Sequence, residues 1–292
     1  MTTQQDAETM SRIGVVGGGL MGSGIAEVCA AARCDVVVRE IDDAACAVAR
    51  HRVEASLARA VKASKVSGTD RDAIFDRIRF TTELDELGDR DLVIEAIVED
   101  ELAKAEVFAQ LDKVVEADDA VFASNTSSIP IMKLAMATSR PHAVLGLHFF
   151  NPVPILRLVE LIPSLLTAPE VAARAEQFAT VTLRKRVIRS QDRAGFVVNS
   201  LLVPYMLSAM RMLESGFATK EDIDTGMVEG CNHPMGPLAL ADLVGLDTVN
   251  AVAESLYDEF KEPLYAPPPL LSRMVDAGLL GRKSKRGFYE YQ

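Results

Sequence analysis

The chain has 292 residues, of which 49% are hydrophobic, so it is long enough for one large or two ordinary domains with a sizeable core. Its net charge of −11 argues against nucleic acid or an anionic membrane surface as the main partner, although a local basic site can still hold an anionic small ligand. No apolar stretch approaches the roughly 20 residues that span a bilayer, the polar N-terminus lacks signal-peptide character, and the four cysteines have no metal-like spacing. These features predict a cytoplasmic location, no membrane association and no metal site.

Short apolar runs alternate with helical patterns over the first part of the chain. Buried strands are expected at 12–17, 34–40, 91–97, 120–126 and 143–149. Helices are expected at 20–32, 42–66, 68–78, 101–115 and 128–137. This alternation predicts an α/β fold with a Rossmann-like, doubly wound parallel sheet.

The pattern changes near residue 190. Helical segments broken by glycine and proline follow, beginning with 195–216, where a bend is expected at Pro204. The tail 287–292 is a candidate for a short extended segment. The sequence therefore predicts an N-terminal domain over 1–190 and an all-helical C-terminal domain over 191–292.

A glycine-rich loop follows the first strand. Gly17, Gly19 and Gly22 have the spacing G-x-G-x-x-G, which allows a tight turn, close approach of a pyrophosphate and close packing of the next helix. The helix N-terminus then offers free N–H groups to the phosphates. The motif predicts a dinucleotide site that includes Leu20 and Met21.

The second strand ends at Glu40, 23 residues beyond Gly17. A carboxylate at this place accepts hydrogen bonds from the ribose hydroxyls of NAD and repels the 2′-phosphate of NADP, so NAD is the predicted cofactor. Arg39 keeps NADP open as the alternative, because an arginine can bind the 2′-phosphate. Asp42 is an alternative ribose ligand, but its position favours a helix cap.

The stretch "HFFNPVPILRLVELI", residues 148–162, joins a histidine and a carboxylate through apolar sequence. If "LRLVEL" is a strand, Glu160 shares a face with Leu156 and Leu158 and needs a buried partner. His148 would suit it, and the two would form a general base; two unrelated residues are the other interpretation. A tight hairpin through "NPVP" places His148 opposite Leu156, about 13 Å along the strand from Glu160. The pair therefore requires a wider connection or another face.

Polar residues follow the strand at 120–126. Asn125, Thr126, Ser127 and Ser128 fall where ligands bind in doubly wound sheets, outside the C-terminal strand ends. Alternatively, the Ser/Thr residues cap the following helix. Asn199 lies in an apolar helix, where its amide either satisfies local backbone or faces a pocket.

Eight motifs together resemble the 3-hydroxyacyl-CoA dehydrogenase family, and within it the single-function bacterial 3-hydroxybutyryl-CoA dehydrogenases. They are "GGGLMGSGIA", "DLVIEAIVED", "ASNTSSI", "GLHFFNPVP", "LVELI", "GFVVNSLLVPY", "HPMGPLALADLVGLDT" and "RGFYEY", in family order from about residue 12 to 291. The resemblance implies an NAD-binding N-terminal domain and a helical C-terminal domain that binds substrate and forms a homodimer. It implies hydride transfer between NAD and the 3-hydroxyl carbon of a short-chain acyl-CoA thioester in fatty acid β-oxidation.

The resemblance also implies roles for individual residues. His148 would be the catalytic base, Glu160 the carboxylate that orients it, and Ser127 and Asn199 the groups that contact the substrate. The implied cofactor-binding residues are Gly17, Gly19, Leu20, Met21, Gly22, Glu40, Glu95, Lys104 and Asn125. The implied contacts to CoA are Ser56, Lys62 and Lys65 in the helical arm.

The sequence departs from the family pattern at two places. Ser200 stands where the family usually has arginine, and Lys285 where its C-terminal motif has glycine. The arm lysines match only loosely, which makes the CoA contacts the weakest part of the resemblance. Dehydrogenases of free β-hydroxy acids are a rival interpretation, but they use a lysine in the helical domain. A non-catalytic NAD-binding protein is another rival, which the presence of both His148 and Glu160 disfavours.

Overall fold

The computed structural model describes residues 10–292; the polar stretch 1–9, in which we expected no signal peptide, lies outside the described residues. The chain divides into two compact units, Met1–Asp192 and Arg193–Gln292. This division falls two residues beyond the boundary predicted at 190. Over the described residues, no helix has the length and apolar character needed to cross a bilayer.

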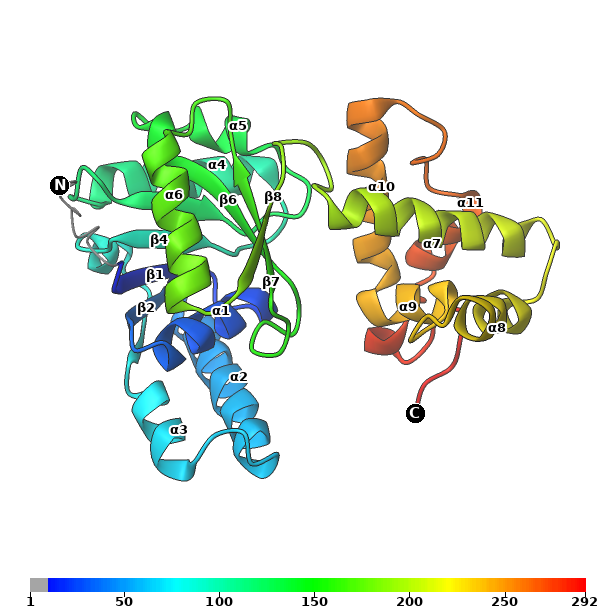
Figure 1. Cartoon of the computed structure of the whole chain (residues 1–292), viewed down its shortest axis with the longest axis horizontal. Coiled ribbons are helices and arrows are strands. Elements are labelled where there is room, and N and C mark those ends of the chain that lie inside the picture. Colours follow the sequence, from blue (N-terminus) through cyan, green and yellow to red (C-terminus); the bar gives the residue numbers. More distant parts are fainter. Residues whose placement is uncertain (1–9) are drawn as a thin grey trace, which may run out of the picture. The chain divides into compact units, whose positions relative to one another are not determined.

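An eight-stranded sheet forms the centre of the first unit, with the order β3-β2-β1-β4-β5-β6-β7-β8 (Figure 1). Its strands are Arg12–Val16 (β1), Asp35–Arg39 (β2), Ile78–Thr81 (β3), Leu92–Glu95 (β4), Val121–Ser124 (β5), Val144–Phe149 (β6), Leu158–Pro163 (β7) and Arg186–Arg189 (β8). Strands β1 to β6 are parallel, β7 runs antiparallel to β6, and β8 is parallel to β7. The predicted doubly wound Rossmann-like sheet is confirmed, with an antiparallel extension at one edge and with β3 and β8 as strands that the sequence pattern did not predict.

Helices cover both faces of this sheet. They are Leu20–Ala31 (α1), Asp43–Lys62 (α2), Gly68–Phe75 (α3), Glu101–Val114 (α4), Ile131–Ala135 (α5) and Pro169–Gln177 (α6), with a π-helical turn at Phe178–Thr182 and 3₁₀ turns at Leu84–Leu87 and Pro141–Ala143. The pair α2 and α3 extends beyond the sheet as a two-helix arm (Figure 1). Asp42 caps α2, since its side chain accepts a 2.7 Å hydrogen bond from the N–H of Ala45, as the sequence predicted.

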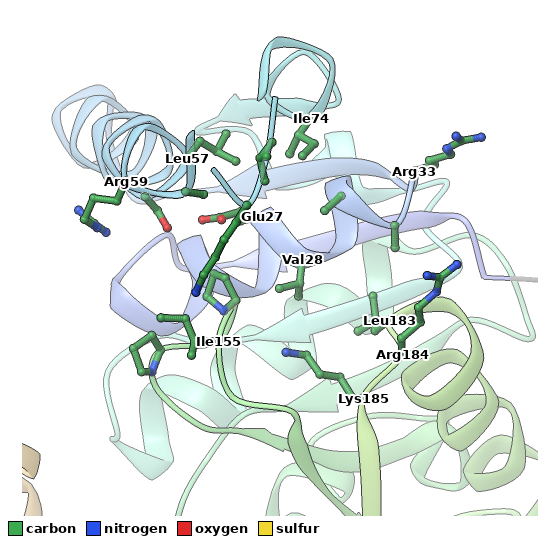
Figure 2. Close-up of a pocket in the computed structure, with 18 of the residues that line it drawn as sticks. Glu27, Val28, Arg33, Leu57, Arg59, Ile74, Ile155, Leu183, Arg184 and Lys185 are labelled. Atoms are coloured by element: carbon green, nitrogen blue, oxygen red, sulfur yellow. The ribbon is translucent and has the colours of Figure 1, made fainter. Parts of the chain in front are cut away.

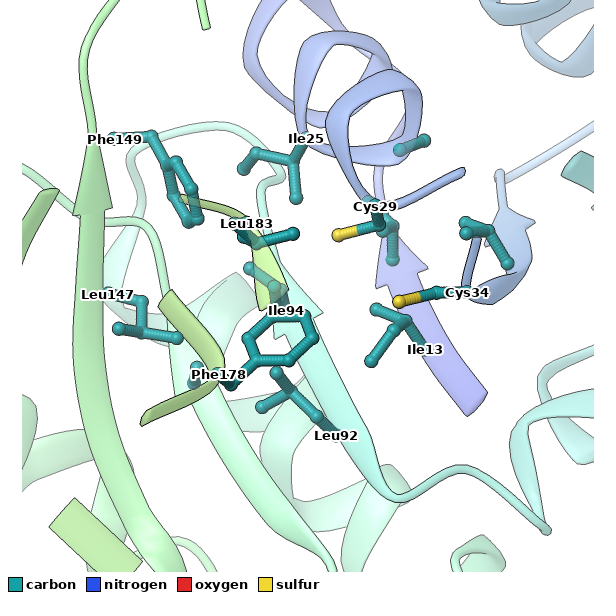
Figure 3. Close-up of a cluster of buried hydrophobic side chains, with 14 of the residues drawn as sticks. Ile13, Ile25, Cys29, Cys34, Leu92, Ile94, Leu147, Phe149, Phe178 and Leu183 are labelled. Carbon is teal, nitrogen blue, oxygen red and sulfur yellow. The ribbon is translucent and has the colours of Figure 1, made fainter. Parts of the chain in front are cut away.

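The main core of the first unit lies on one face of the sheet. Ile13 of β1, Leu92 of β4 and Leu147 of β6 pack in one cluster with Cys29 of α1 and Phe178 (Figure 3). Burying a side chain of this size contributes about 1.5–3 kcal/mol. Because successive strand residues face opposite sides, the residue that follows Leu147 points to the other face of the sheet.

The second unit is all-helical, as predicted. Its helices are Val198–Glu214 (α7), Lys220–Cys231 (α8), Pro237–Val244 (α9), Leu246–Phe260 (α10) and Pro269–Asp276 (α11), with a 3₁₀ turn at Arg282–Ser284. Pro204 lies inside α7, and the bend expected there stays a prediction. Near the C-terminus two isolated bridges form, Gly281 with Arg286 and Arg286 with Glu290, and the second of them includes a residue of the tail 287–292.

Buried aspartates hold the tail and the start of α9 in this unit. Asp242, 1% exposed, accepts hydrogen bonds from the N–H groups of Phe288 and Tyr289 at 3.0 and 2.9 Å and from the Tyr291 hydroxyl at 2.9 Å. Asp224 accepts hydrogen bonds from two N–H groups of α9 and from the hydroxyl of Tyr289. These carboxylates are therefore structural, because backbone N–H groups and tyrosine hydroxyls surround them.

Candidate active site

The glycine loop joins β1 to the N-terminus of α1. Gly17 has φ +92°, and a Cβ there would lie 2.7 Å from the carbonyl oxygen of Ala96. A Cβ on Gly22 would lie 1.7 Å from the carbonyl oxygen of Gly17, so both glycines are required by the fold. A Cβ on Gly19 would meet nothing within 4 Å. Packing therefore does not require a glycine at position 19. Gly19 instead leaves open space in front of the uncapped N–H groups of α1, and this space suits a pyrophosphate.

Glu40 lies beside this loop at the end of β2. Its Oε1 accepts a 2.6 Å hydrogen bond from the N–H of Gly18. Arg39 donates through Nε to the carbonyl of Thr82 at 3.3 Å. The carboxylate thus stands at the glycine loop, where it suits the ribose hydroxyls of a dinucleotide.

Glu95 and Lys104 form a buried ion pair at the end of β4. The Lys104 amine is 2.6 Å from Glu95 Oε1, and the two residues are 1% and 0% exposed. Glu95 also accepts hydrogen bonds from the N–H of Ile97 at 2.7 Å and from the hydroxyl of Ser124 at 2.6 Å. A direct contact of either residue with a cofactor stays a prediction.

A second carboxylate, Glu99, joins this pair to the loop after β5 and was not among the site residues predicted from the sequence. Its Oε2 is 3.3 Å from the Lys104 amine, and its Oε1 accepts hydrogen bonds from the Thr126 hydroxyl at 2.6 Å and the Ser127 N–H at 2.8 Å. Burial alone would raise the pKa of Glu99, but Lys104 and these hydrogen bonds outweigh it and lower the pKa. The sequence feature that could have indicated Glu99 is the second glutamate of "EAIVED", four residues after Glu95.

The loop Asn125–Ser128 lies at the C-terminal edge of the sheet, as predicted. Asn125 Oδ1 accepts a 2.9 Å hydrogen bond from the N–H of Phe149, which ties the end of β5 to the end of β6. Asn125, Thr126 and Ser128 are buried, whereas Ser127 is half-buried and so is the most accessible of the four. This places Ser127 where it suits contact with a ligand.

The alternative interpretation, a Ser/Thr cap on the following helix, is wrong. Helix α5 begins at Ile131, and the N–H groups of Ile131 and Met132 donate to the two carboxylate oxygens of Asp192 at 2.7 and 2.8 Å. Thr126 closes the loop instead, since its hydroxyl oxygen accepts a 2.9 Å hydrogen bond from the N–H of Ile129. A carboxylate from a distant part of the chain therefore does the capping.

His148 and Glu160 are direct neighbours across β6 and β7. In the antiparallel register His148 stands opposite Glu160, and Phe149 opposite Val159. The tight hairpin that would have set His148 opposite Leu156 is wrong, because β7 begins only at Leu158 and the connection is correspondingly wide. Of the two interpretations, two unrelated residues or a pair, the structure has the pair.

The geometry of this pair suits proton transfer. His148 Nδ1 lies 2.7 Å from Glu160 Oε2, and the residues are 5% and 0% exposed. The ring of Phe150 packs on the imidazole, with ring centroids 4.6 Å apart. A buried carboxylate at Nδ1 fixes the tautomer and stabilises a protonated ring, so the other nitrogen, Nε2, can act as a general base.

Asn199 lies on the second unit, as the second residue of α7, and is half-buried. Its role toward a ligand stays a prediction. Ser200, which follows it, donates its hydroxyl to the carbonyl oxygen of Phe196 at 2.6 Å. Within residues 10–292, no group of three or more His, Cys, Asp or Glu side chains is arranged to hold a metal ion.

A cleft of about 1220 Å³ lies between α1, the two-helix arm, the β6–β7 connection and the segment before β8 (Figure 2). We call it the arm cleft. Residues labelled around it are Glu27, Val28, Arg33, Leu57, Arg59, Ile74, Ile155, Leu183, Arg184 and Lys185. Of the predicted CoA contacts, Ser56 and Lys65 line the arm cleft, whereas Lys62 is an exposed residue at the end of α2 that does not line it.

Both parts of the chain match a known family. Residues 12–193 match the 3-hydroxyacyl-CoA dehydrogenase NAD binding domain, and residues 195–291 match the 3-hydroxyacyl-CoA dehydrogenase C-terminal domain. The two matches meet close to the division between the two compact units.

Several known proteins are similar to this chain over nearly its whole length. A 3-hydroxybutyryl-CoA dehydrogenase of Mycobacterium tuberculosis is 59% identical over 98% of this chain and 100% of its own length. The crystal structure of FadB2 from M. tuberculosis superposes with a TM-score of 0.97 at 59% identity, over 98% of this chain and 100% of that one. The structure of (S)-3-hydroxybutyryl-CoA dehydrogenase PaaH1 from Ralstonia eutropha superposes with a TM-score of 0.92 at 45% identity, over 97% of this chain and 100% of that one. The chain therefore belongs to the 3-hydroxyacyl-CoA dehydrogenase family.

Proposed function

We propose that the protein is an NAD-dependent dehydrogenase that oxidises the 3-hydroxyl of a short-chain 3-hydroxyacyl-CoA, such as 3-hydroxybutyryl-CoA, to the ketone. The observation that carries this proposal is the buried pair of His148 and Glu160, 2.7 Å apart. It lies at the end of β6, at the same edge of the parallel sheet as the glycine loop after β1. A proton acceptor and a dinucleotide site at one sheet edge are what oxidation of an alcohol needs.

In the proposed reaction, Nε2 of His148 takes the proton of the substrate 3-hydroxyl. Glu160 holds Nδ1 and stabilises the imidazolium that forms, as the carboxylate does in a Ser-His-Asp triad. When bound, NAD supplies a nicotinamide ring that accepts a hydride from the carbon that bears this hydroxyl. In the reverse direction, with the reduced cofactor as the source of the hydride, Nε2 returns its proton to the oxygen and acetoacetyl-CoA is reduced to the 3-hydroxyl compound.

The glycine loop and Glu40 support NAD as the cofactor. Gly19 leaves space at the N-terminus of α1 for the pyrophosphate, and the position of Glu40 at the glycine loop supports a role as acceptor of hydrogen bonds from the ribose hydroxyls. The remaining cofactor contacts that we propose are Gly17, Leu20, Met21, Gly22, Glu95, Lys104 and Asn125. For the last three, the buried network of Glu95 and Lys104 and the bond from Phe149 to Asn125 support a role in shaping the nicotinamide end.

For the substrate, we propose that Ser127 and Asn199 hold the 3-oxygen and the thioester carbonyl. The arm cleft takes the CoA portion, with Ser56 and Lys65 in its wall. Lys62, which does not line the cleft, is the third CoA contact that we propose. The size of the cleft and its basic side chains suit a long anionic carrier.

The wider assignments are part of the same proposal. The first domain, 1–190, binds NAD, and the second, 191–292, binds substrate and forms a homodimer. Exposed apolar side chains on the second unit, such as Leu201 at 73% and Phe217 at 79%, support an interface there. We place the enzyme in the cytoplasm, in fatty acid β-oxidation.

An assay of nicotinamide absorbance tests the proposal. Purified protein is expected to reduce NAD with 3-hydroxybutyryl-CoA, to prefer NAD over NADP in kcat/KM, and to leave free 3-hydroxybutyrate unreacted. Turnover of the free acid without CoA would contradict the substrate class, and a preference for NADP would give the recognition role to Arg39 instead of Glu40.

A further inference from the structure

Glu27 is a buried carboxylate in the wall of the arm cleft. It lies on α1, and only 6% of its surface is exposed (Figure 2). Its Oε2 atom is buried without a hydrogen-bond partner among the described residues. Such a group opposes folding, because a carboxylate removed from water needs donors to replace the lost hydration.

Other deeply buried carboxylates accept hydrogen bonds from protein groups: Glu95, Glu160 and Asp242. In Glu27, by contrast, one of the two oxygens, Oε2, has no partner among the described residues. Burial raises its pKa, and the hydroxyl of Ser56 and the charge of Arg59 oppose this shift without cancelling it. A buried polar atom without a partner, at the wall of a large cleft, is typical of a ligand-binding position.

All other charged side chains that line the arm cleft are basic: Arg33, Arg59, Lys65, Arg184 and Lys185. In a chain with a net charge of −11, this concentration indicates an anionic ligand. Arg33 and Arg184 come from distant parts of the sequence, and both hold left-handed backbone, with φ 70° and 54°. Figure 2 shows them at one end of the arm cleft, with Arg59 at the other.

The charges therefore sort along the arm cleft. A carboxylate repels phosphate, so the phosphates belong at the end with Arg33 and Arg184, and the part of the ligand near Glu27 carries hydrogen-bond donors. CoA combines both kinds of group in one molecule. Its phosphates are anionic, its pantetheine arm has two amide N–H groups, and its adenine has an amino group.

Resting on the CoA-thioester function proposed above, we propose that Glu27 is a substrate-binding residue whose carboxylate accepts a hydrogen bond from an N–H group of the CoA portion. The donor is either an amide of the pantetheine arm or the amino group of adenine. Either donor would give the Glu27 carboxylate a hydrogen-bond partner that the described residues do not supply.

Steady-state kinetics of three variants test this inference. Glu27→Met keeps the volume but removes the acceptor, and is expected to raise the KM for 3-hydroxybutyryl-CoA by about tenfold or more with kcat nearly unchanged, the signature of binding lost equally in ground and transition states. Glu27→Gln keeps a neutral acceptor and is expected to lie between wild type and Glu27→Met. Glu54→Gln, an exposed glutamate of α2 that does not line the arm cleft, is the matched control and should behave as wild type.

The thioester of pantetheine, which lacks the adenosine and its phosphates, identifies the donor. If Glu27→Met raises its KM as it does for the CoA thioester, the donor is a pantetheine amide. If the effect disappears, the donor is the adenine amino group. Wild-type turnover of 3-hydroxybutyryl-CoA is measured first, so failure of the proposed function appears as an inactive wild type and not as an effect of Glu27.

Thermal unfolding separates binding from a structural role. Because Oε2 has no protein partner, Glu27→Met is expected to unfold at the wild-type temperature or above it, and free CoA is expected to stabilise it less than it stabilises wild type. A wild-type KM in Glu27→Met overturns the inference. If that variant does not fold, a wild-type KM in Glu27→Gln overturns it equally.

Discussion

Both units of the molecule bury carboxylates, but the two sets have different partners. In the second unit, Asp242 accepts hydrogen bonds from backbone N–H groups and a tyrosine hydroxyl, which hold the tail in place. In the first unit, Glu160 faces His148, and Glu95 faces the amine of Lys104. The partner of a buried carboxylate, more than its burial, distinguishes a position suited to proton transfer or ligand binding from one that holds the fold.

The surroundings of the two sets differ as well. The carboxylates of the first unit stand at the C-terminal ends of parallel strands or next to them, where α/β proteins bind ligands. Those of the second unit lie between helices and the tail that crosses them. Substitutions in the first set should therefore change rates, and substitutions in the second should change stability.

The largest effect is expected for His148→Gln. Loss of the general base should lower kcat by about 100-fold or more, while the thermal stabilisation by NAD stays at the wild-type level. His142→Gln, an exposed histidine of the same unit, is the control and should retain wild-type kcat. Near wild-type turnover in His148→Gln would place His148 with the structural residues.

Glu160→Gln should have a smaller effect in the same direction. The amide keeps the volume and a hydrogen bond to Nδ1 but cannot stabilise the imidazolium, so kcat should fall by about tenfold or more. The urea midpoint should change little beside this fall in rate. A variant that keeps its kcat but loses stability would show that Glu160, like Asp242, is a structural carboxylate. That result would contradict the difference between the buried carboxylates of the two units.

The sequence predicted those parts of the fold that local pattern determines. Five strands of the parallel sheet, the glycine loop and the cap at Asp42 all follow from residues close together in the chain. Strands β3 and β8 and helix α6 were not predicted. β3 and β8 have only half of their residues or fewer fully buried, so their apolar signal is weak.

Site features that depend on residues far apart in the sequence could not be predicted from local pattern. The sequence could place His148 and Glu160 in consecutive apolar runs, but their pairing depends on a wide connection whose path the sequence did not reveal. The cap of α5 comes from Asp192, 61 residues beyond Ile131, so the alternative interpretation of the local Ser/Thr residues as its cap was wrong. Glu99 was missed because its partners lie on a loop that only the fold brings close.

Asp242→Asn tests the structural side of the comparison. The amide nitrogen would face a backbone N–H or a hydroxyl donor, so the free energy of unfolding should fall by about 2 kcal/mol. The kcat of the folded enzyme should be unchanged. Asp258→Asn, which removes one partner of an exposed ion pair with Lys261, is the control and should cost less than about 1 kcal/mol in urea unfolding. A large loss of kcat at unchanged stability would instead give Asp242 a role in the reaction.

The smallest effect concerns alkaline pH and the tail of the second unit. Burial, and next the hydrogen bond to Asp242, raise the pKa of Tyr291 to about 12. In the unfolded chain a tyrosine ionises near pH 10, so between about pH 10 and 12 the unfolded state binds fewer protons than the folded state, and stability falls as pH rises. Tyr291→Phe removes this contribution, and its urea midpoint should fall less between pH 8 and pH 11 than that of wild type. Tyr257→Phe, at a more exposed position on α10, should keep the wild-type difference. Parallel pH dependence in Tyr291→Phe and wild type would show that the tail does not depend on the bond between Tyr291 and Asp242.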